Sequence, residues 1–492
     1  MQEQYIEKML QGFSKAKQTR SSWESVWQEC YDFTLPHYQY GTNKSKTAKD
    51  LYDATAMDAV DQLAASLLGN LTPPWNQWFG FKPGPNLSEE EAEKIAPLLE
   101  TITAKIHAHL DQSNFSVELH QCFLDLIIGG TATLYVEETE PGALSAFKFT
   151  AVPLYDVYLE EGEHGFLDIS YRHLELNARQ IQNRYQLGSF PEDLKNEMNE
   201  SSDKKYNILE AIYPKMNRYE FHAVLMDGSK PIVIKDGYFD VSPVIGFRWM
   251  KSPGEVYGRS PVMKALPDIK TANKVVELIL KNASIAVTGI WQADDDGVLN
   301  PANIELLPGT IIPKAVGSQG LRALEMPGRF DVSELVLKDL RARIRQALLS
   351  DKLNGVVDQK MTATEVLERS SQIALLLGAT YGRLQTELLT PLVKRLFYIL
   401  KRRGDIPDIQ LDGKTVALDY RSPLAKSQSQ RGINNILMWL DSVSAMGADA
   451  SLNINKQEVV KYLGDSLAVP KNLLSSQELP IDLISEIGEE QI

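Results

Sequence analysis

The spacing of apolar and polar residues divides the chain into a helical first part, a strand-rich middle and a mainly helical last part. Before residue 130, apolar side chains recur three or four positions apart, which is the period of one face of an α-helix. This pattern predicts helices over residues 1–36, 50–71, 88–110 and 114–128. The stripe of the first helix that we expect to face a core consists of Trp23, Val26, Trp27 and Cys30.

From residue 131 apolar and polar residues alternate with a period of two, which predicts β-strands. A helical stretch over residues 176–205 interrupts the alternation and is interpreted as an insertion. Helices followed by an antiparallel meander of strands predict an α+β fold. The predicted strands lie in TATLYVEE, ALSAFKFTAVPLYDVYLEEG, FLDISYRHLEL, YNILEAIYPK, YEFHAVLMD, KPIVIKDGYFD and PVIGFRWM.

Two further amphipathic helices are predicted over residues 262–287 and 331–350. The second carries a basic face, formed by Lys338, Arg341 and Arg345. A basic face of this kind either stays solvated, forms salt bridges between subunits or contacts DNA, and the first two interpretations are the more common. The apolar stripe of the same helix consists of Leu335, Val336, Leu340, Ile344, Ala347 and Leu348.

The longest helical pattern of the sequence runs from Met361 to Arg403. It opens with a capping box formed by Thr362 and Glu365 and ends in a basic turn followed by a glycine. Pro391 has no N–H to donate, so we expect a kink or break there. At about 1.5 Å per residue, some forty residues span roughly 60 Å, which exceeds the width of a small domain. Such a helix connects layers or subunits.

The remaining segments predict smaller features. Trp75, Trp78, Phe79 and Phe81 form an aromatic cluster that we interpret as a packing anchor. After the long helix, IQLDG and KTVALDY suggest a hairpin, and further helices are expected near residues 429–446 and 456–464.

Composition describes an ordinary soluble protein with an acidic balance. Of the 492 residues 43% are hydrophobic, and the mean hydropathy is -0.23. No apolar run reaches the eighteen or so residues of a membrane span, and the N-terminus lacks the apolar core of a signal peptide. We therefore expect synthesis in the cytoplasm and no membrane partner. The two cysteines, Cys30 and Cys122, are interpreted as buried small side chains.

The net charge of -14 limits what the chain does with nucleic acid. A protein that grips the DNA backbone needs clustered Lys and Arg, because affinity comes from neutralised phosphates. Any contact of this chain with DNA is therefore expected to be weak, or confined to one surface.

Residue types and spacing do not form a recognisable catalytic, metal or cofactor site. Gly413-Lys414-Thr415 resembles the end of a phosphate loop but lacks the first glycine. His107 and His109 are two apart and point to different faces of a helix. Asp294 to Asp296 are interpreted as a solvated turn rather than a cation site. We expect no catalytic residues, no metal and no cofactor, and therefore no enzyme.

Four stretches in order resemble the portal, or head-to-tail connector, proteins of short-tailed bacteriophages. The resemblance covers most of the chain. Its most recognisable motif is a turn that feeds a helix, with Tyr257, Gly258, Arg259 and Ser260 at its centre. The four stretches are LAASLLGNLTPPWNQWFGF, GEVYGRSPVMKALPDIKTANKVVE, MTATEVLERSSQIALLLGATYGRLQTELLTPLVKRLFYIL and INKQEVVKYLGDSLAVPKNLLSS.

The resemblance implies a portal-type subunit with several named regions. Long helices and antiparallel sheets would form a wing, a stem, a clip and a crown. The implied regions are the wing (1–261), first stem helix (262–287), clip (288–330), second stem helix (331–350), channel loop (351–361), long helix with a wing hairpin (362–424), and crown with C-terminal tail (425–492).

The resemblance also implies partners and a location. The subunit would form a ring of about twelve copies at one capsid vertex of the virion. Double-stranded DNA would pass through the ring, and the terminase large subunit, tail adaptor or tail tube proteins, and capsid and scaffold or core proteins would dock on it. The channel loop would face the DNA with Lys352, Asn354, Gly355, Asp358 and Lys360.

Two other functions remain open at this point. One is a different ring or adaptor protein of a phage tail. The other is a nucleic-acid-processing enzyme with an unrecognised site, which predicts a small oligomer with a concave pocket instead of a ring with a channel.

Overall fold

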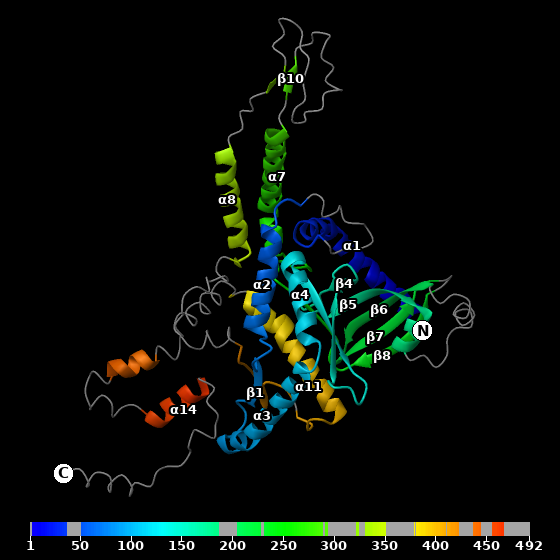
Figure 1. The fold of residues 1–492 in the computed structure, drawn as a ribbon. Coiled ribbons are helices and arrows are strands. Elements are labelled where there is room, and N and C mark those ends of the chain that lie inside the picture. Colours follow the sequence, from blue (N-terminus) through cyan, green and yellow to red (C-terminus); the bar gives the residue numbers. More distant parts are fainter. Residues whose placement is uncertain are drawn as a thin grey trace, which may run out of the picture.

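The computed structural model of the chain confirms an α+β architecture of helices and antiparallel sheets (Figure 1). A central body carries the sheets and most of the core, and a pair of helices projects from it. The residues that the structure describes are 2–36, 51–185, 204–227, 231–288, 291–293, 321–323, 330–350, 378, 380–409, 411–422, 436–443 and 455–466.

Four helices form the first part of the chain, as the apolar spacing predicts. They are α1 (Gln2–Thr34), α2 (Thr55–Leu71), α3 (Glu89–Asp111) and α4 (Phe115–Gly129). Helix α2 begins five residues later than expected, and just before it the side chain of Asp53 accepts from the backbone N–H of Thr55 at 2.9 Å. Helix α3 starts at a capping box in which Ser88 and Glu91 each accept from the other's backbone.

The strands divide into two main sheets. The five-stranded sheet is an antiparallel meander, as predicted, and the three-stranded sheet has the order β3-β2-β9. A short helix, α5 (Ala178–Tyr185), follows β5 and confirms the start of the predicted insertion. The strands of the two sheets are β4 (Val157–Glu160), β5 (Ile169–Asn177), β6 (Lys205–Lys215), β7 (Arg218–Leu225) and β8 (Ile232–Phe239), and β2 (Thr131–Glu138), β3 (Phe147–Val152) and β9 (Val244–Arg248).

The hairpin expected after the long helix is wrong. Strand β12 (Val416–Tyr420) pairs instead with β1 (Phe79–Pro83), a strand more than 300 residues earlier that alternation did not reveal. Residues before β12 form a turn in which Asp412 accepts from the backbone of Lys414 and Thr415 at 2.8 and 2.7 Å. The same contacts occupy the N–H groups that a phosphate loop would need free.

Two long helices project from the body side by side (Figure 1). Helix α7 (Pro261–Thr288) and helix α8 (Phe330–Ala347) match the predicted ranges closely. Beyond them, β10 (Trp291–Ala293) and β11 (Leu321–Ala323) pair antiparallel. The apolar stripe predicted for α8 is wrong at Leu335 and Val336, which are exposed.

The long helix predicted from Met361 is described from residue 380 onward. It does not break at Pro391. It widens into a π-helical turn, η3 (Gln385–Leu389), and continues as α11 (Thr390–Arg403), which Gly404 caps at φ 80°. Because Pro391 has no N–H, the regular ladder is lost at this point, and the N–H of Thr390 bonds to the carbonyl of Gln385 in the wider register.

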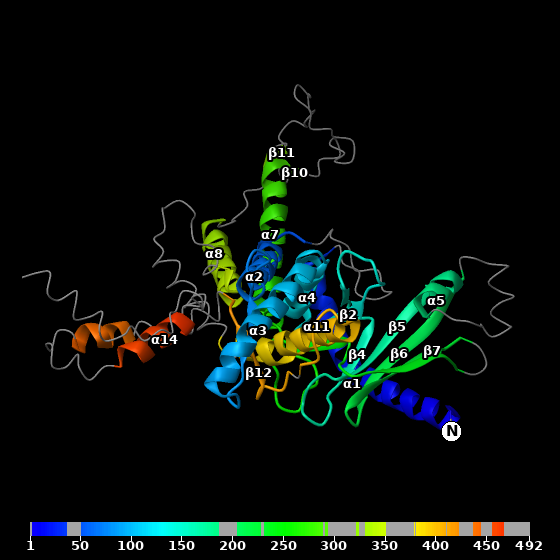
Figure 2. The same cartoon turned by 90° about the horizontal axis from the view of Figure 1, so that it is seen from below.

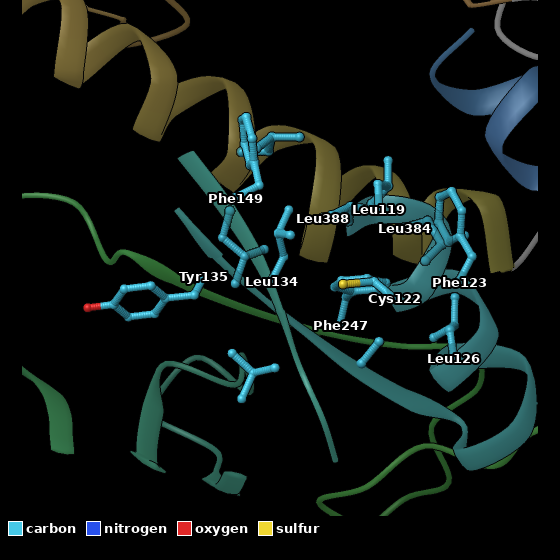
Figure 3. Close-up of a cluster of buried hydrophobic side chains, with 14 of the residues drawn as sticks. Leu119, Cys122, Phe123, Leu126, Leu134, Tyr135, Phe149, Phe247, Leu384 and Leu388 are labelled. Carbon is cyan, nitrogen blue, oxygen red and sulfur yellow. The ribbon is translucent and has the colours of Figure 1, made fainter. Parts of the chain in front are cut away.

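The main core lies between the helices and the three-stranded sheet. Figure 3 shows side chains of α4, including Cys122 and Phe123, against Leu134 and Phe247 of the sheet, with Leu388 on the adjoining helix. Both cysteines are buried and free, as expected. Two expected core positions are wrong: Val26 is 38% exposed and Trp75 is 76% exposed, whereas the other aromatics of that cluster are buried.

A smaller core joins the N-terminal half of α1 to one face of the five-stranded sheet (Figure 2). Phe13 packs edge-on against Tyr158 with ring centroids 5.0 Å apart. Nearer the C-terminus, residues 436–443 are helical within the predicted range 429–446, and α14 (Lys456–Ser466) starts as predicted and extends two residues beyond the predicted end at 464. The predicted capping box at Thr362 and the acidic run at 294–296 lie outside the described residues.

Candidate functional site

The predicted motif turn is the point at which α7 is fastened to the body. Tyr257 is fully buried and packs edge-on against Trp27, with ring centroids 4.9 Å apart. Its hydroxyl accepts from the backbone N–H of Leu159 at 3.1 Å. Burial raises the pKa of Tyr257 to about 12, so the phenol stays neutral. One residue therefore joins α1, the five-stranded sheet and the base of α7.

Gly258 is required by a close approach of two backbones. A Cβ at this position would lie 2.2 Å from the carbonyl oxygen of Gly130, the residue that ends α4 in the left-handed region at φ 79°. The N–H of Gly258 donates to the hydroxyl of Thr131 at 2.8 Å. The two glycines let the turn sit directly on the end of α4.

The last two residues of the motif start the helix. The hydroxyl of Ser260 accepts from the N–H of Met263 at 2.8 Å, which is the contact of an N-cap. Arg259 is exposed, contacts Glu255 at 2.9 Å and lies over the ring of Trp23 at 5.5 Å. The motif thus sets the origin and direction of α7, and only Arg259 faces solvent.

A buried charge network, which the sequence analysis missed, ties the sheet to the π-helical turn. Arg248 of β9 is fully buried, and its guanidinium donates to Glu387 of η3 at 2.8 and 3.2 Å. Glu161 contacts the same guanidinium, and Arg383 reaches Glu387 at 3.0 Å. Burial lowers the pKa of Arg248, but the bonds to the two carboxylates outweigh it and raise the pKa.

The three residues of the predicted basic face separate into two kinds. Arg341 pairs with Asp53, a nearly buried carboxylate, at 2.8 Å. Burial raises the pKa of Asp53, but hydrogen bonds from Thr55 and Arg341 outweigh it and lower the pKa. The backbone N–H groups of Tyr52 and Asp53 donate to the side chain of Asn273 of α7 at 2.7 and 3.2 Å. Because Asp53 also pairs with Arg341 of α8, this segment bridges the two helices. Lys338 and Arg345 are exposed.

The predicted channel loop, with Lys352, Asn354, Gly355, Asp358 and Lys360, lies outside the described residues. In the part of the chain that the structure describes, no group of three or more His, Cys, Asp or Glu side chains is placed to hold a metal ion. His107 contacts the carbonyl of Phe79 and His109 contacts the backbone of Ala146, on different elements. Among the described helices, none has the length and apolar content of a membrane span.

Comparison with known proteins identifies the family. Residues 7–474 match the sequence model of the family described as bacteriophage head to tail connecting protein. Because this match spans nearly the whole chain, the chain belongs to that family.

Individual relatives agree with this assignment. The chain is 23% identical over 523 residues to the portal protein of Salmonella phage epsilon15, covering 100% of this chain and 92% of that protein. It is 23% identical to the portal protein of Enterobacteria phage T3, over 89% of this chain and 86% of that protein. The portal protein of Escherichia phage T7 is 22% identical, over 81% of this chain and 75% of that protein.

Among solved structures, the chain is similar to one from the neck of an empty GTA particle computed with C6 symmetry. The TM-score is 0.36 at 11% identity, over 83% of this chain and 88% of that one. At this score the likeness is too slight to define the fold.

Proposed function

We propose that the chain is the subunit of a phage portal: a ring, of twelve copies, at one vertex of the capsid. The observation that carries the proposal is the family match over residues 7–474, together with full-length relatives that are named portal proteins. In this role the ring is the conduit through which double-stranded DNA is packaged and later ejected. The terminase large subunit, and then the tail adaptor, dock on it, and capsid and core proteins surround it.

The arrangement of the described elements supports this division of labour. The body of helices and sheets serves as the wing, and the projecting helices α7 and α8 serve as the stem. The short pair β10 and β11 belongs to the clip, which meets the terminase. The helices near the C-terminus belong to the crown.

The charge of the chain suits a conduit better than a DNA-binding protein. Each phosphate that a wall neutralises adds salt-dependent affinity, so a strongly basic channel would hold DNA in place. A net charge of -14, with 51 Lys and Arg against 65 Asp and Glu, opposes such binding and allows DNA to slide. We assign the residual contacts to the channel loop, through Lys352 and Lys360. The role is structural, and the energy for packaging comes from the separate terminase motor.

The test is the state of assembly of the purified full-length chain. Electron micrographs should show rings with an axial opening, and their mass should correspond to about twelve subunits. A compact monomer at all protein concentrations and salt conditions would contradict the portal assignment.

A further inference from the structure

The segment just before α2 holds the projecting pair α7 and α8 at a second place, farther along the helices than the motif turn. The side chain of Asp53 is 4% exposed, and its carboxylate accepts from Arg341 of α8 at 2.8 Å. The backbone N–H groups of Tyr52 and Asp53 donate to the side chain of Asn273 of α7. One short segment of the body therefore contacts both helices at one level. We call these contacts the bridge.

Burial along α7 changes at the bridge. Before it, Ile269 and Ala272 are 3% and 0% exposed, and Asn273 itself is 8% exposed. From Lys274 to Ser284, where the structure describes the side chains, none is buried. Figure 1 shows the same division, because the far part of the pair extends beyond the start of α2. Among the described side chains of α7, the bridge therefore contacts the last buried one.

Burial along α8 changes within one turn of the same level. Glu334, Leu335 and Val336 are exposed, and burial begins at Leu337, four residues before Arg341. From there toward the body, every third or fourth side chain of the helix is buried. Both helices therefore have a buried part near the body and a distal part that is largely exposed.

We propose that Asp53 is a positioning residue for the distal part of the pair, because the bridge and the motif turn together fix the direction of α7 and α8. A helix that is held at one point can tilt, whereas a helix held at two points has a fixed direction. The motif turn is the first point. The second lies twelve residues farther along α7, at Asn273, which is about 18 Å at 1.5 Å per residue.

The ion pair supplies what apolar packing does not. Burial of apolar side chains is non-directional, so it holds α8 against its neighbours without fixing its angle. A charge-assisted hydrogen bond adds geometric specificity, because donor and acceptor must keep both distance and orientation. Asp53 is itself held in place, since its carboxylate also accepts from the N–H of Thr55 and its own N–H donates to Asn273.

The consequence for the channel rests on the proposed function. In the proposed ring the distal parts of α7 and α8 lead to β10 and β11, so the direction of the pair determines where these strands lie relative to the axis. The positioning role of Asp53 belongs to the single chain and can be tested without the ring.

The test measures the distance between nitroxide spin labels on Glu334 of α8 and Asp61 of α2, each replaced by cysteine. Both side chains are exposed, and the two native cysteines are buried, so the labels attach to the introduced positions. The doubly labelled full-length chain is diluted with unlabelled chain, so that pulsed electron paramagnetic resonance records distances within one copy.

The variant is Asp53→Asn, whose carboxamide keeps an oxygen for the N–H of Thr55 but offers no charge to Arg341. We expect the distance distribution to shift or broaden by about 4 Å. A tilt of about ten degrees produces this displacement over the fourteen residues from Leu348 to Glu334, which span roughly 21 Å.

Asp268→Asn is the matched control. Asp268 of α7 pairs with Arg343 of α8, also at 2.8 Å, and joins the same two helices nearer the body. This variant should leave the distance distribution as it is in the wild type. The inference is wrong if Asp53→Asn gives the wild-type distribution, or if Asp268→Asn changes the distribution as much as Asp53→Asn does.

The measurement also separates positioning from stability. If Asp53 only stabilised the fold, its loss would lower the unfolding temperature without moving the labels in chains that remain folded. If circular dichroism shows that Asp53→Asn does not fold, Arg341→Gln removes the same ion pair from its more exposed side, where the side chain is 39% exposed. The same distances are then measured, and an unchanged distribution again refutes the inference.

The result for Asp53 and the result for the ring are independent. Unchanged distances in a variant that forms rings would remove the positioning role and leave the portal role intact. Shifted distances in a chain that never forms rings would support the positioning role and remove the portal role.

Discussion

At the scale of single residues, the contact between Gly130 and Gly258 shows how little room the motif turn leaves. The missing side chain at Gly258 allows two backbones to touch, and its N–H is also used. Any added atom must displace the end of α4 or the start of α7.

Replacing Gly258 with Ala should therefore destabilise the chain. Overpacking of a tight site costs about 1–3 kcal/mol, and here the obstacle is backbone, which yields less than a side chain. Thermal or denaturant unfolding measures the loss. Gly237→Ala is the control, because a Cβ there meets nothing within 4 Å. Equal stability of the two variants would contradict the close-approach explanation.

A second residue, Asp125, makes stability depend on pH. Burial raises the pKa of its carboxyl to about 7, although the hydroxyl of Tyr31, which donates to it at 2.7 Å, lowers the pKa. The folded chain therefore holds this proton more tightly than the unfolded chain, in which the pKa of Asp is about 3.9. The resulting stabilisation is complete below about pH 4 and is lost as pH rises to about 7.

The variant Asp125→Asn should lose less stability over this range than the wild type. Asparagine keeps an oxygen for the Tyr31 hydroxyl but never ionises. Unfolding temperatures measured in steps from pH 5 to pH 8 should fall more steeply for the wild type. Parallel curves for the two proteins would show that the buried carboxyl does not titrate in this window.

At the scale of elements, the buried pair Arg248 and Glu387 couples the three-stranded sheet to the π-helical turn η3. The turn exists because Pro391 removes a donor from the ladder, and Glu387 lies within it. The sheet therefore holds the long helix at the place where the backbone of that helix departs from regular geometry.

Replacing Glu387 with Ala should be strongly destabilising, because it leaves a fully buried guanidinium without its main carboxylate. Breaking a buried ion pair from one side costs about 3–5 kcal/mol. Arg383→Ala removes a partner of the same carboxylate that is 31% exposed, and should cost much less. Denaturant unfolding of both variants decides the matter. A mild effect of Glu387→Ala would mean that Glu161 alone neutralises Arg248.

Local signals in the sequence predicted local structure well. Apolar residues at helical spacing located α3 and α7, and the alternation of apolar and polar residues located the meander. Each of these features depends on residues a few positions apart. The family resemblance then placed Tyr257 to Ser260 as a motif, but only the structure shows that three of its four residues face inward.

What the sequence did not show are contacts between distant segments. Arg248 and Glu387 are 139 residues apart, and β1 and β12 are separated by most of the chain. A single charged residue in each of two apolar runs, FRW and TELL, was the available signal. No pattern within either run identifies its partner. Leu335 and Val336 were misplaced because helical spacing alone does not distinguish an apolar position that packs against the same chain from one that stays exposed in it.

At the scale of the whole molecule, the proposed channel loop is the place where charge should matter for DNA. Changing both Lys352 and Lys360 to Glu removes two positive charges and adds two negative charges per subunit, and the change repeats around a ring. We expect reduced retention or translocation of DNA, with ring assembly unchanged. A packaging assay measures the first and electron microscopy the second.

The control for this pair is Lys148→Glu with Lys205→Glu, two exposed lysines on strands β3 and β6 whose reversal gives the same change in charge. If both double variants package DNA equally, the loop has no special contact with DNA. If the loop variant instead fails to form rings, the loop contributes to assembly.

The fastening of α7 at its base has a mechanical consequence. With 28 residues, the helix is about 42 Å long at 1.5 Å per residue, and the motif turn holds one end of it. A tilt of one degree at the turn displaces the far end by roughly 0.7 Å over that length. The helix therefore acts as a lever, and the angular tolerance of a few buried atoms around Gly258 becomes the positional tolerance of the distal tip. In a ring of such helices, a small change of tilt at the motif turn of each subunit would change the width of the opening between the distal ends.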